Sequence, residues 1–411
     1  MNKILQKWFS SFLCIALCAV LLAGCTSTDS ADKGKDENKK NEETTVNESG
    51  TDGQQDQDNN QDENQTDDSE QGGNDSEDPD HYTVAISMPQ QSDRWKDDAA
   101  NMERGLKAIG YEVITRYADN DVKQQAAQVQ ELAGMQPDCM VIAPADPAGL
   151  AEAVESAAAA GIPVISYDLL LMDTDAVSFY TAFDSSGAGI LIGQAIIEKA
   201  GLDSLSDGEY RTIEFFMGDA KDRSAKLLYK GLMEALEPYL DQGTLVCKSG
   251  RTSMKETAVA KESQIKAQKR CADTLAKYYA DEDLDICAAA SDILSYGCQE
   301  AFKASGYTVE NWPLISGQNC ELEACGNILE GTQSFSIYKD TRELALKCVS
   351  MIEALLSGME PEINDVEQYD NHVLTVPAYV CTPIVVDADN LEETLVEGGF
   401  YTKEQIDSVR P

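Results

Sequence analysis

The sequence predicts an α/β protein in which doubly wound parallel sheets form two lobes. From Thr83 onward, short apolar segments of strand length alternate with segments of helical periodicity, and the alternation starts again at Arg211. Strict alternation of this kind is typical of a parallel sheet that helices cover on both faces. The part of the chain that carries it is about 330 residues long, more than one hydrophobic core usually covers. We therefore expect two lobes.

Residues 1–25 have the pattern of an export signal. Lys3 and Lys7 give a basic start, an apolar run follows, and the run ends in Leu-Ala-Gly-Cys at Cys25. That ending resembles the bacterial lipobox, which implies cleavage before Cys25 and lipidation of its sulfur. The alternative is a membrane-spanning anchor, but the run is near the lower length limit and ends in small residues. We expect a lipid-anchored protein on the extracytoplasmic face of the cell membrane.

Residues 26–80 predict a disordered acidic linker. They contain 19 acidic and 4 basic residues, a net charge of −15, and Val46 is their only large apolar residue. Taking this segment and the first 25 residues (net +2) from the total of −41 leaves −28 for residues 81–411. So acidic a body excludes nucleic acid as an expected partner, because phosphate binding needs positive charge.

The cysteine and histidine content does not predict a metal site or a cofactor site. Nine cysteines follow Cys25, without any Cys-x-x-Cys pair, and the histidines His81 and His372 have no metal-ligand spacing. Cys320 and Cys325 are close enough in sequence to form a disulfide, and the sequence leaves that question open.

The first alternation leads to a candidate binding loop. A strand at 83–87 is followed by a loop at 90–95 that carries Arg94 and Trp95, and a helix is predicted at 99–109. The carboxyl edge of a parallel sheet is the usual ligand crevice of open α/β folds. Trp95 can offer a flat face to a sugar ring, and Arg94 can donate hydrogen bonds to hydroxyls. The alternative is that Trp95 packs under the loop and Arg94 is a solvated charge.

The remaining elements follow in order. Further strands are predicted at 111–114, 138–142, 162–166, 179–183, 212–217, 244–248, 286–290, 313–316 and 333–338, with an extended segment at 376–386. Helices are predicted at 122–135, 148–160, 187–200, 225–236, 257–279, 293–304, 343–356 and 388–398. Gly187, Gly189 and Gly193 have the wrong spacing for a dinucleotide site, so we interpret them as a helix start that packs closely on the sheet.

These residues resemble the type I periplasmic binding proteins of ABC sugar importers, and most of all the multiple-sugar and xylose-binding group. The resemblance covers nearly all of residues 82–405. It is carried by Ser-x-Arg-Trp at 92–95, Tyr-Ala-Asp-Asn-Asp at 117–121, Ile-Ser-Tyr-Asp at 165–168, Ser-Gly-Gln at 316–318, Tyr-Lys-Asp-Thr-Arg-Glu-Leu at 338–344 and Glu-Gly-Gly-Phe-Tyr at 397–401.

The resemblance implies two lobes joined by three crossovers, with a sugar in the cleft between them. We expect residues 81–184 and 319–375 in the first lobe, and residues 185–318 and 376–411 in the second. It also implies a set of ligand-binding residues: Arg94, Trp95, Asp168, Asp222, Arg223, Asp292, Gln318, Asn319 and Lys339. Carboxylates accept from sugar hydroxyls while Arg and Lys donate to them, and such charge-assisted bonds are the stronger kind. Lys339 is expected to point into the cleft from the first lobe.

Two departures from the family pattern bear on the ligand. Many relatives have Arg after the aspartate that ends the fourth strand, whereas Asp168 is followed by Leu169; relatives often have Asp where Asn319 stands. One cation and one anion are thus lost together, which keeps the site's charge balanced and leaves the sugar unidentified. For each site residue the alternative role is a contact that stabilises a loop or joins the lobes.

The function expected is capture of a monosaccharide, an aldopentose or aldohexose, for an ABC permease, by a monomer without a cofactor. A sugar-sensing subunit that docks on a membrane receptor kinase or chemoreceptor would use the same fold and site. An enzyme is the third alternative, because Asp168 and Asp292 could formally serve as an acid and base pair. The family uses its carboxylates to grip ligands, so we do not expect catalysis.

Overall fold

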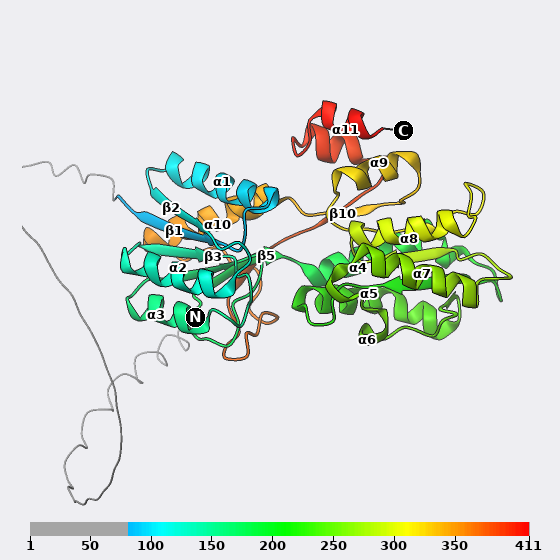
Figure 1. The fold of residues 1–411 in the computed structure, drawn as a ribbon, viewed down its shortest axis with the longest axis horizontal. Coiled ribbons are helices and arrows are strands. Elements are labelled where there is room, and N and C mark those ends of the chain that lie inside the picture. Colours follow the sequence, from blue (N-terminus) through cyan, green and yellow to red (C-terminus); the bar gives the residue numbers. More distant parts are fainter. Residues whose placement is uncertain (1–80, 411) are drawn as a thin grey trace, which may run out of the picture. The chain divides into compact units, whose positions relative to one another are not determined.

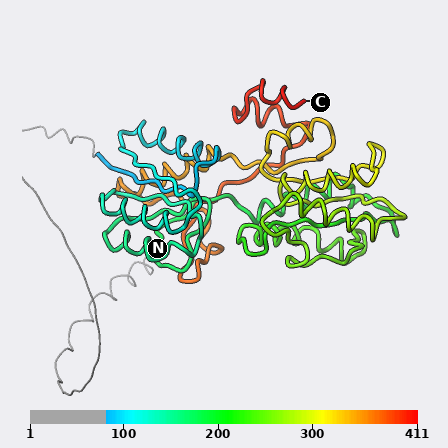
Figure 2. The backbone as a smooth tube through the Cα atoms, viewed as in Figure 1, coloured from blue at the N-terminus to red at the C-terminus, as the bar shows by residue number. Residues whose placement is uncertain are grey.

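The computed structural model describes residues 81–410, and Figures 1 and 2 trace their path. The predicted signal segment, Cys25 and the predicted linker at 26–80 lie outside the described residues. Within residues 81–410, no helix has both the length and the apolar character needed to cross a membrane.

The first lobe is built on a six-stranded sheet with the order β11-β5-β4-β3-β1-β2, in which every neighbouring pair is parallel. Its strands are β1 (Thr83–Met88), β2 (Glu112–Tyr117), β3 (Cys139–Ile142), β4 (Val164–Tyr167), β5 (Phe179–Phe183) and β11 (Ala378–Cys381). Helices α1 (Asp93–Ala108) and α10 (Thr341–Leu356) bury apolar side chains on one face. Helices α2 (Val122–Gly134) and α3 (Ala151–Ala159) do so on the other.

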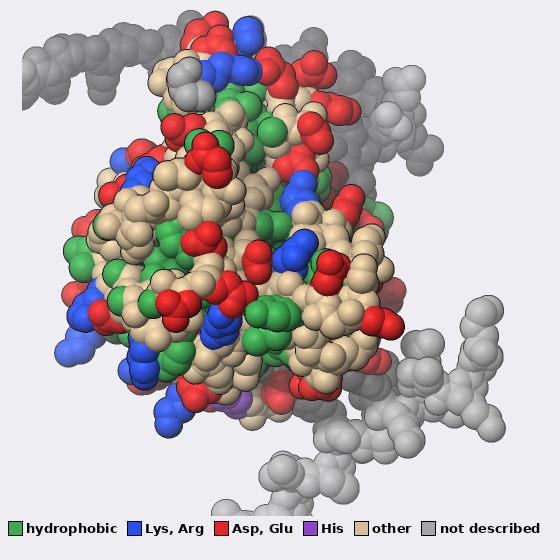
Figure 3. Space-filling view, turned by 90° about the vertical axis from the view of Figure 1, so that its right-hand side faces the viewer, with side chains coloured by type: hydrophobic (Ala, Val, Ile, Leu, Met, Phe, Trp, Pro, Cys, Tyr) green, Lys and Arg blue, Asp and Glu red, His purple; other side chains and the backbone are tan. Residues whose placement is uncertain are grey.

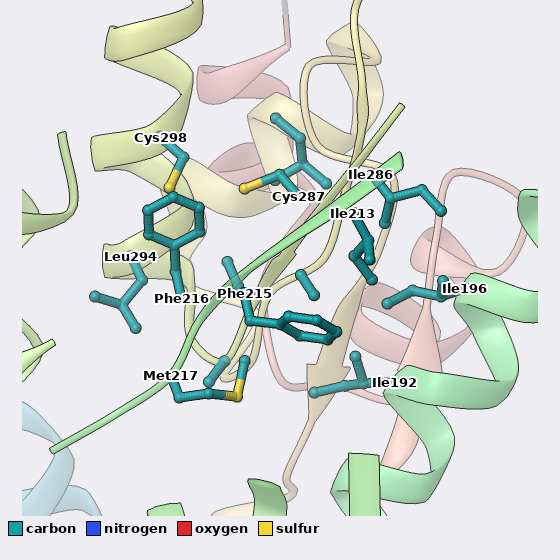
Figure 4. Packing of buried hydrophobic residues seen from close by; sticks show 14 of the residues in the cluster. Ile192, Ile196, Ile213, Phe215, Phe216, Met217, Ile286, Cys287, Leu294 and Cys298 are labelled. Carbon is teal, nitrogen blue, oxygen red and sulfur yellow. The ribbon is translucent and has the colours of Figure 1, made fainter. Parts of the chain in front are cut away.

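The second lobe repeats this plan on a four-stranded parallel sheet with the order β7-β6-β8-β9. Its strands are β6 (Arg211–Phe216), β7 (Leu245–Val246), β8 (Ile286–Ala289) and β9 (Leu314–Ile315). Successive residues of β6 point to opposite faces, so Phe215 lies toward Ile192 of α4 (Ser185–Lys199) while Phe216 lies toward Leu294 of α8 (Asp292–Ala304), as Figure 4 shows. Helices α5 (Arg223–Gln242) and α7 (Gln264–Tyr278) complete the two covering layers. The predicted α/β fold with parallel sheets is confirmed.

A smaller layer belongs to the second lobe. Strands β10 (Ser336–Tyr338) and β12 (Ile384–Val386) pair antiparallel. They pack with α9 (Leu322–Glu330), the short π-helix at Glu392–Glu397 and α11 (Lys403–Val409) around a separate apolar cluster. Cys320 and Cys325 are buried in that cluster as free thiols, and Cys325 Sγ donates to the Cys320 carbonyl oxygen at 3.6 Å.

The chain passes between the lobes in three places, and two of them differ from the expected boundaries. Residue 184 separates β5 from α4, close to the expected division. The second passage follows β10, so residues 319–338 belong to the second lobe and not the first. The expected extended segment 376–386 is two strands, of which β11 pairs with β5 in the first lobe and β12 with β10 in the second. Both boundaries depend on which strands pair with each other, and the sequence pattern does not show these pairings.

The helices differ from the prediction at three places. Helix α1 begins at Asp93, so Arg94 and Trp95 lie in its first turn and not on a loop. The single helix expected at 257–279 is broken into α6 (Met254–Thr257), a 3₁₀ turn at Ala260–Glu262 and α7, because Lys261 and Glu262 have positive φ angles of 61° and 46°. Helix α9 lies in a stretch, between the expected strands at 313–316 and 333–338, for which no helix was predicted.

The surface of the described part is predominantly acidic, as the sequence indicates. Figure 3 shows acidic side chains spread over the face that it presents, with Lys and Arg side chains among them. Several of these are paired on the surface, for example Lys269 with Asp273 at 2.8 Å. Such exposed pairs contribute little to stability, so the fold rests on its buried apolar clusters.

Helices α4 and α5 approach each other at two glycines. A Cβ atom on Gly189 would overlap the carbonyl oxygen of Leu228, and one on Gly231 would overlap the carbonyl oxygen of Ser186. Gly189 and Gly193 therefore serve close packing as expected, but their partner is helix α5 and not the sheet, whereas a Cβ atom on Gly187 would meet the side chain of Asp184. This contact fixes the amino-terminal ends of both helices, which line the cavity described below.

We predict that Gly231→Ala lowers the free energy of unfolding by about 1–3 kcal/mol or more, since overpacking forces backbone shifts. Gly134→Ala is the matched control: Gly134 lies exposed on α2 with no atom near its missing Cβ, so alanine there should stabilise by about 0.5–1 kcal/mol. Denaturant titration of both variants measures the difference, and equal stabilities would contradict the close contact.

Candidate ligand-binding site

A cavity of about 230 Å³ lies where strands of both sheets end at their carboxyl edges. This is the position that open α/β sheets use for ligands. Its walls are formed by Arg94, Asp168, Leu169, Phe183, Ser185, Gly218, Asp222, Ser224, Ala225, Leu228, Glu262, Ala290, Gln318, Asn319 and Lys339. Six of the nine expected ligand residues are in this set: Arg94, Asp168, Asp222, Gln318, Asn319 and Lys339. Trp95, Arg223 and Asp292 are not.

Arg94 is held in place by two carboxylates of the first lobe. Its Nε donates to Oδ2 of Asp98 at 2.8 Å, one helical turn further along α1, and Asp98 is completely buried. Its Nη2 lies 3.2 Å from Oδ1 of Asp168. Nη2 is nevertheless buried without a hydrogen-bond acceptor among the described residues. The guanidinium is therefore fixed in position, while Nη2 has an ion-pair contact but no hydrogen-bond acceptor.

The charges in this group depend on each other. Burial disfavours the charged form of Arg94, but attraction to Asp168 and Asp98 outweighs it and raises the pKa of Arg94 above its usual value. Burial raises the pKa of Asp98 to about 6, although Arg94 opposes the shift. Asp98 thus holds Arg94 although burial disfavours its own charged form. The sequence did not indicate this role.

Asp168 reaches the cavity because of an unusual backbone conformation. Its φ of 63° is in the left-handed region, which Asp tolerates better than most residues. The amide of Asp168 donates to the Thr181 carbonyl oxygen at 2.8 Å, and the carbonyl oxygen of Asp168 accepts from the hydroxyl of Tyr180 at 2.7 Å. Leu169 follows as an apolar part of the wall. The turn after β4 is thereby locked, with the carboxylate beside Arg94.

The second lobe supplies Asp222, Gln318 and Asn319 from the ends of its strands. Asp222 caps α5: its Oδ1 accepts from the amides of Ser224 at 2.7 Å and Ala225 at 3.3 Å. Nothing among the described residues donates to its Oδ2. Gln318 Nε2 donates weakly to the Ala290 carbonyl oxygen at 3.4 Å, so its amide retains free capacity.

Lys339 and Glu262 bring opposite charges from different parts of the chain. Lys339 lies on the crossover between β10 of the second lobe and α10 of the first, and not within the first lobe as expected. Burial lowers the pKa of Lys339, and its Nζ lies 5.8 Å from the centre of the Phe183 ring. Glu262 comes from the 3₁₀ turn before α7 and was not among the expected site residues. Ser263 caps the start of α7, and a serine at this position is the sequence feature that could have indicated a helix start there instead of a continuous helix.

Trp95 packs in the first lobe. Its half-buried side chain lies against the apolar cluster under α1 and α10, and the guanidinium of Arg94 lies 4.9 Å from the centre of its ring. In this structure Trp95 supports Arg94 and does not line the cavity, which is the packing alternative that the sequence left open.

Arg223 joins the two lobes. Its Nη1 donates to the Asp370 carbonyl oxygen at 2.8 Å and its Nη2 to the Gln368 carbonyl oxygen at 2.6 Å. Both acceptors lie in the first-lobe segment between α10 and β11. It lines a neighbouring cavity of about 680 Å³, which shares Leu169 and Asp222 with the first. Arg223 therefore has the lobe–lobe role, and the expected ligand contact is not seen.

Asp292 is a structural carboxylate. It is completely buried at the start of α8, where Oδ1 accepts from Gln333 Nε2 and Ser336 Oγ, each at 2.8 Å, and Oδ2 accepts from the amide of Glu321 at 2.9 Å. Burial raises the pKa of Asp292 to about 7, against the effect of these three hydrogen bonds. It anchors the crossover and does not reach the ligand cavity, so the expected ligand contact is not seen here either.

Comparison with known proteins agrees with this arrangement. The periplasmic binding protein domain family matches residues 84–360. The chain is 37% identical over 330 residues to the multiple sugar-binding periplasmic receptor of Rhizobium radiobacter, covering 80% of this chain and 93% of that protein. It is 29% identical over 315 residues to the D-xylose-binding periplasmic protein of Haemophilus influenzae, covering 76% and 88%. The crystal structure of an ABC transporter solute binding protein from Clostridium phytofermentans with bound β-D-glucose superimposes with a TM-score of 0.71 at 39% identity, covering 79% and 99%.

We predict that Asp292 makes stability depend on pH. Its pKa is about 7 when folded and about 4 in an unfolded chain. Its contribution to the free energy of unfolding is therefore complete below about pH 4 and is lost as the pH rises through 7. Asp292→Asn should reduce the slope of unfolding free energy against pH by up to about 1.4 kcal/mol per pH unit between pH 5 and 7.

Denaturant titrations at several pH values measure this slope. The matched control is Asp281→Asn, at an exposed site of the same lobe, which should keep the slope of the unmodified protein. If Asp292→Asn also kept that slope, Asp292 would not be the titrating group.

Proposed function

This chain belongs to the periplasmic binding protein family, and on that premise we propose that it is an extracytoplasmic lipoprotein that captures a monosaccharide for an ABC sugar importer. The ligand is an aldopentose or an aldohexose. The sugar-binding names of the relatives and the β-D-glucose in the Clostridium phytofermentans protein support this substrate class.

The observation that carries the proposal is the unfilled donor capacity of Arg94. A buried donor without an acceptor costs free energy, roughly 1–3 kcal/mol, unless a ligand supplies the acceptor. Nη2 of Arg94 is such a donor, on a side chain that lines the cavity. A sugar hydroxyl both accepts and donates, so one ligand group can accept from Arg94 and donate to the neighbouring Asp168. That pairing suits a polyol.

The mechanism follows from the two origins of the cavity wall. Arg94 and Asp168 come from the first lobe, and Asp222 and Gln318 from the second, so a ligand that contacts both sets favours the conformation in which the lobes are together. The contacts of Arg223 with carbonyl oxygens of the first lobe hold the same conformation. Release to the permease requires the lobes to separate.

Anchoring and delivery complete the proposal. Lipidation of Cys25 would hold the protein at the membrane, and the acidic segment 26–80 would let the binding body reach the permease while tethered. We propose that it acts as a monomer. The names of the relatives are those of binding proteins and receptors, so the enzymatic alternative is set aside. A sensing role would use the same site, and no observation on this chain favours it over import.

We predict that calorimetric titration with D-glucose, D-xylose, D-galactose and D-ribose finds at least one sugar bound with a dissociation constant near micromolar or tighter, about −8 kcal/mol. Arg94→Ala should weaken that binding by about 10- to 100-fold, because a charge-assisted hydrogen bond contributes about 1.5–3 kcal/mol. Arg104→Ala, at an exposed position on the same helix, should bind normally. Failure of the unmodified protein to bind any of the four sugars would overturn the proposal.

A further inference from the structure

Glu262 is a charged side chain of the cavity that has no partner. No hydrogen bond or ion pair joins its carboxylate to any residue of the described part, and it lies half-buried in the cavity wall. A Cβ atom on Gly218 would clash with its Oε1, so the carboxylate lies directly over the backbone at the end of β6. The glycine leaves the room that this position needs.

The backbone that presents Glu262 is held in an unusual conformation. Lys261 and Glu262 are successive non-glycine residues with positive φ, a region that Lys and Glu adopt less readily than Gly, Asn or Asp. The turn is fixed by Oδ2 of Asp219, which accepts from the Lys261 amide at 2.8 Å, and by the Glu262 amide, which donates to the Val259 carbonyl oxygen at 3.0 Å. Strain of this kind persists only where surrounding contacts determine it, and it clusters at ligand sites.

The electrostatic environment of Glu262 is unbalanced. Burial raises the pKa of its carboxyl group, and the nearby carboxylates of Asp222, Asp219 and Glu321 raise it further, whereas Lys339 lowers it. Lys339 itself has no ion pair or hydrogen bond within the described residues, and its pKa is lowered by burial. Both groups thus lie in a desolvated place with no hydrogen-bond or ion-pair partner for their side chains among the described residues, and a hydroxylated ligand between them would supply hydrogen bonds to each.

The charges of the whole site favour a neutral ligand. Arg94 and Lys339 are the two cations, and Arg94 is already matched by Asp98 and Asp168. Asp222 and Glu262 add two more carboxylates to the wall. The carboxylates of Asp168, Asp222 and Glu262 outnumber the two cations of the wall, so a ligand carboxylate would add a further negative charge where negative charge is already in excess. Like charges close together repel each other in a partly buried site.

We propose that Glu262 is a ligand-contacting acceptor of the second lobe and that it makes the cavity select neutral sugars against sugars that carry a carboxylate, such as uronic acids. The inference rests on the proposed function, because it concerns the same site. It goes beyond it by naming the residue that excludes anionic sugars.

Calorimetric titration with the four neutral aldoses named above, and with D-glucuronate and D-galacturonate, tests the inference. We expect the unmodified protein to bind either uronate at least about 100-fold more weakly than its best neutral aldose. Glu262→Gln keeps the shape and one acceptor oxygen but removes the charge. It should weaken binding of that aldose by about 5- to 10-fold, while uronate binding stays the same or becomes tighter. The ratio of the uronate dissociation constant to the aldose dissociation constant should therefore decrease.

The matched control is Glu234→Gln, an exposed position on α5 of the same lobe that makes the same change in charge. It should leave both affinities unchanged. Melting temperatures without sugar separate binding from folding, and Glu262→Gln should melt no lower than the unmodified protein, because it removes a charge that burial disfavours.

The outcomes are distinct. If the unmodified protein binds a neutral aldose but Glu262→Gln leaves both affinities as they were, Glu262 does not contact the ligand and the inference is wrong while the proposed function stands. Uronate binding as tight as aldose binding in the unmodified protein also overturns the selectivity. If the unmodified protein binds no neutral aldose, the proposed function itself fails and the inference fails with it.

Discussion

The guanidinium of Arg94 is the group on which the site depends. It is held by the completely buried Asp98 and by Asp168, and attraction to these two carboxylates raises the pKa of Arg94 although burial opposes its charge. A single Arg in a first helical turn would otherwise move between many rotamers. Here two carboxylates fix it and it packs against Trp95, so binding of a ligand in the cavity that it lines does not have to order it.

The two-lobe construction makes binding a conformational event. Each lobe has apolar clusters of its own, and the strands that end at the cavity come from both sheets. The charged groups are divided in the same way, with Arg94 and Asp168 on one side, Asp222 and Glu262 on the other, and Lys339 on a crossover. No lobe alone offers a full set of donors and acceptors. A ligand therefore stabilises the conformation in which the lobes are together, by the difference between its binding free energies for that conformation and for the separated one.

The sequence allowed the fold class and part of the site to be predicted, for a physical reason. Arg94 and Asp168 each follow a strand closely, and the carboxyl ends of parallel strands converge at one edge, so their meeting could be expected. The same rule placed Asp292 at the edge of the second sheet. That it is satisfied internally depends on Gln333 and Ser336, which are 41 and 44 residues away. Nothing local indicates those contacts.

Glu262 was missed for a related reason. Residues 257–279 have helical periodicity, and the break in that helix is held by Asp219, which lies 42 residues before Lys261 in the sequence. The lobe boundaries at the last two crossovers depend likewise on strand pairing between distant segments. In each case a hydrogen bond between distant segments overrides the local sequence pattern. Site residues that are positioned by such a bond cannot be found from sequence periodicity.

The most direct test of the central claim is a crystal structure of the protein with D-glucose. We predict one sugar in the 230 Å³ cavity, with its hydroxyls within hydrogen-bond distance of Arg94 and Asp168 from the first lobe and of Asp222 or Glu262 from the second. A sugar that contacts only one lobe, or that lies outside this cavity while Arg94 Nη2 remains without an acceptor, would contradict the account.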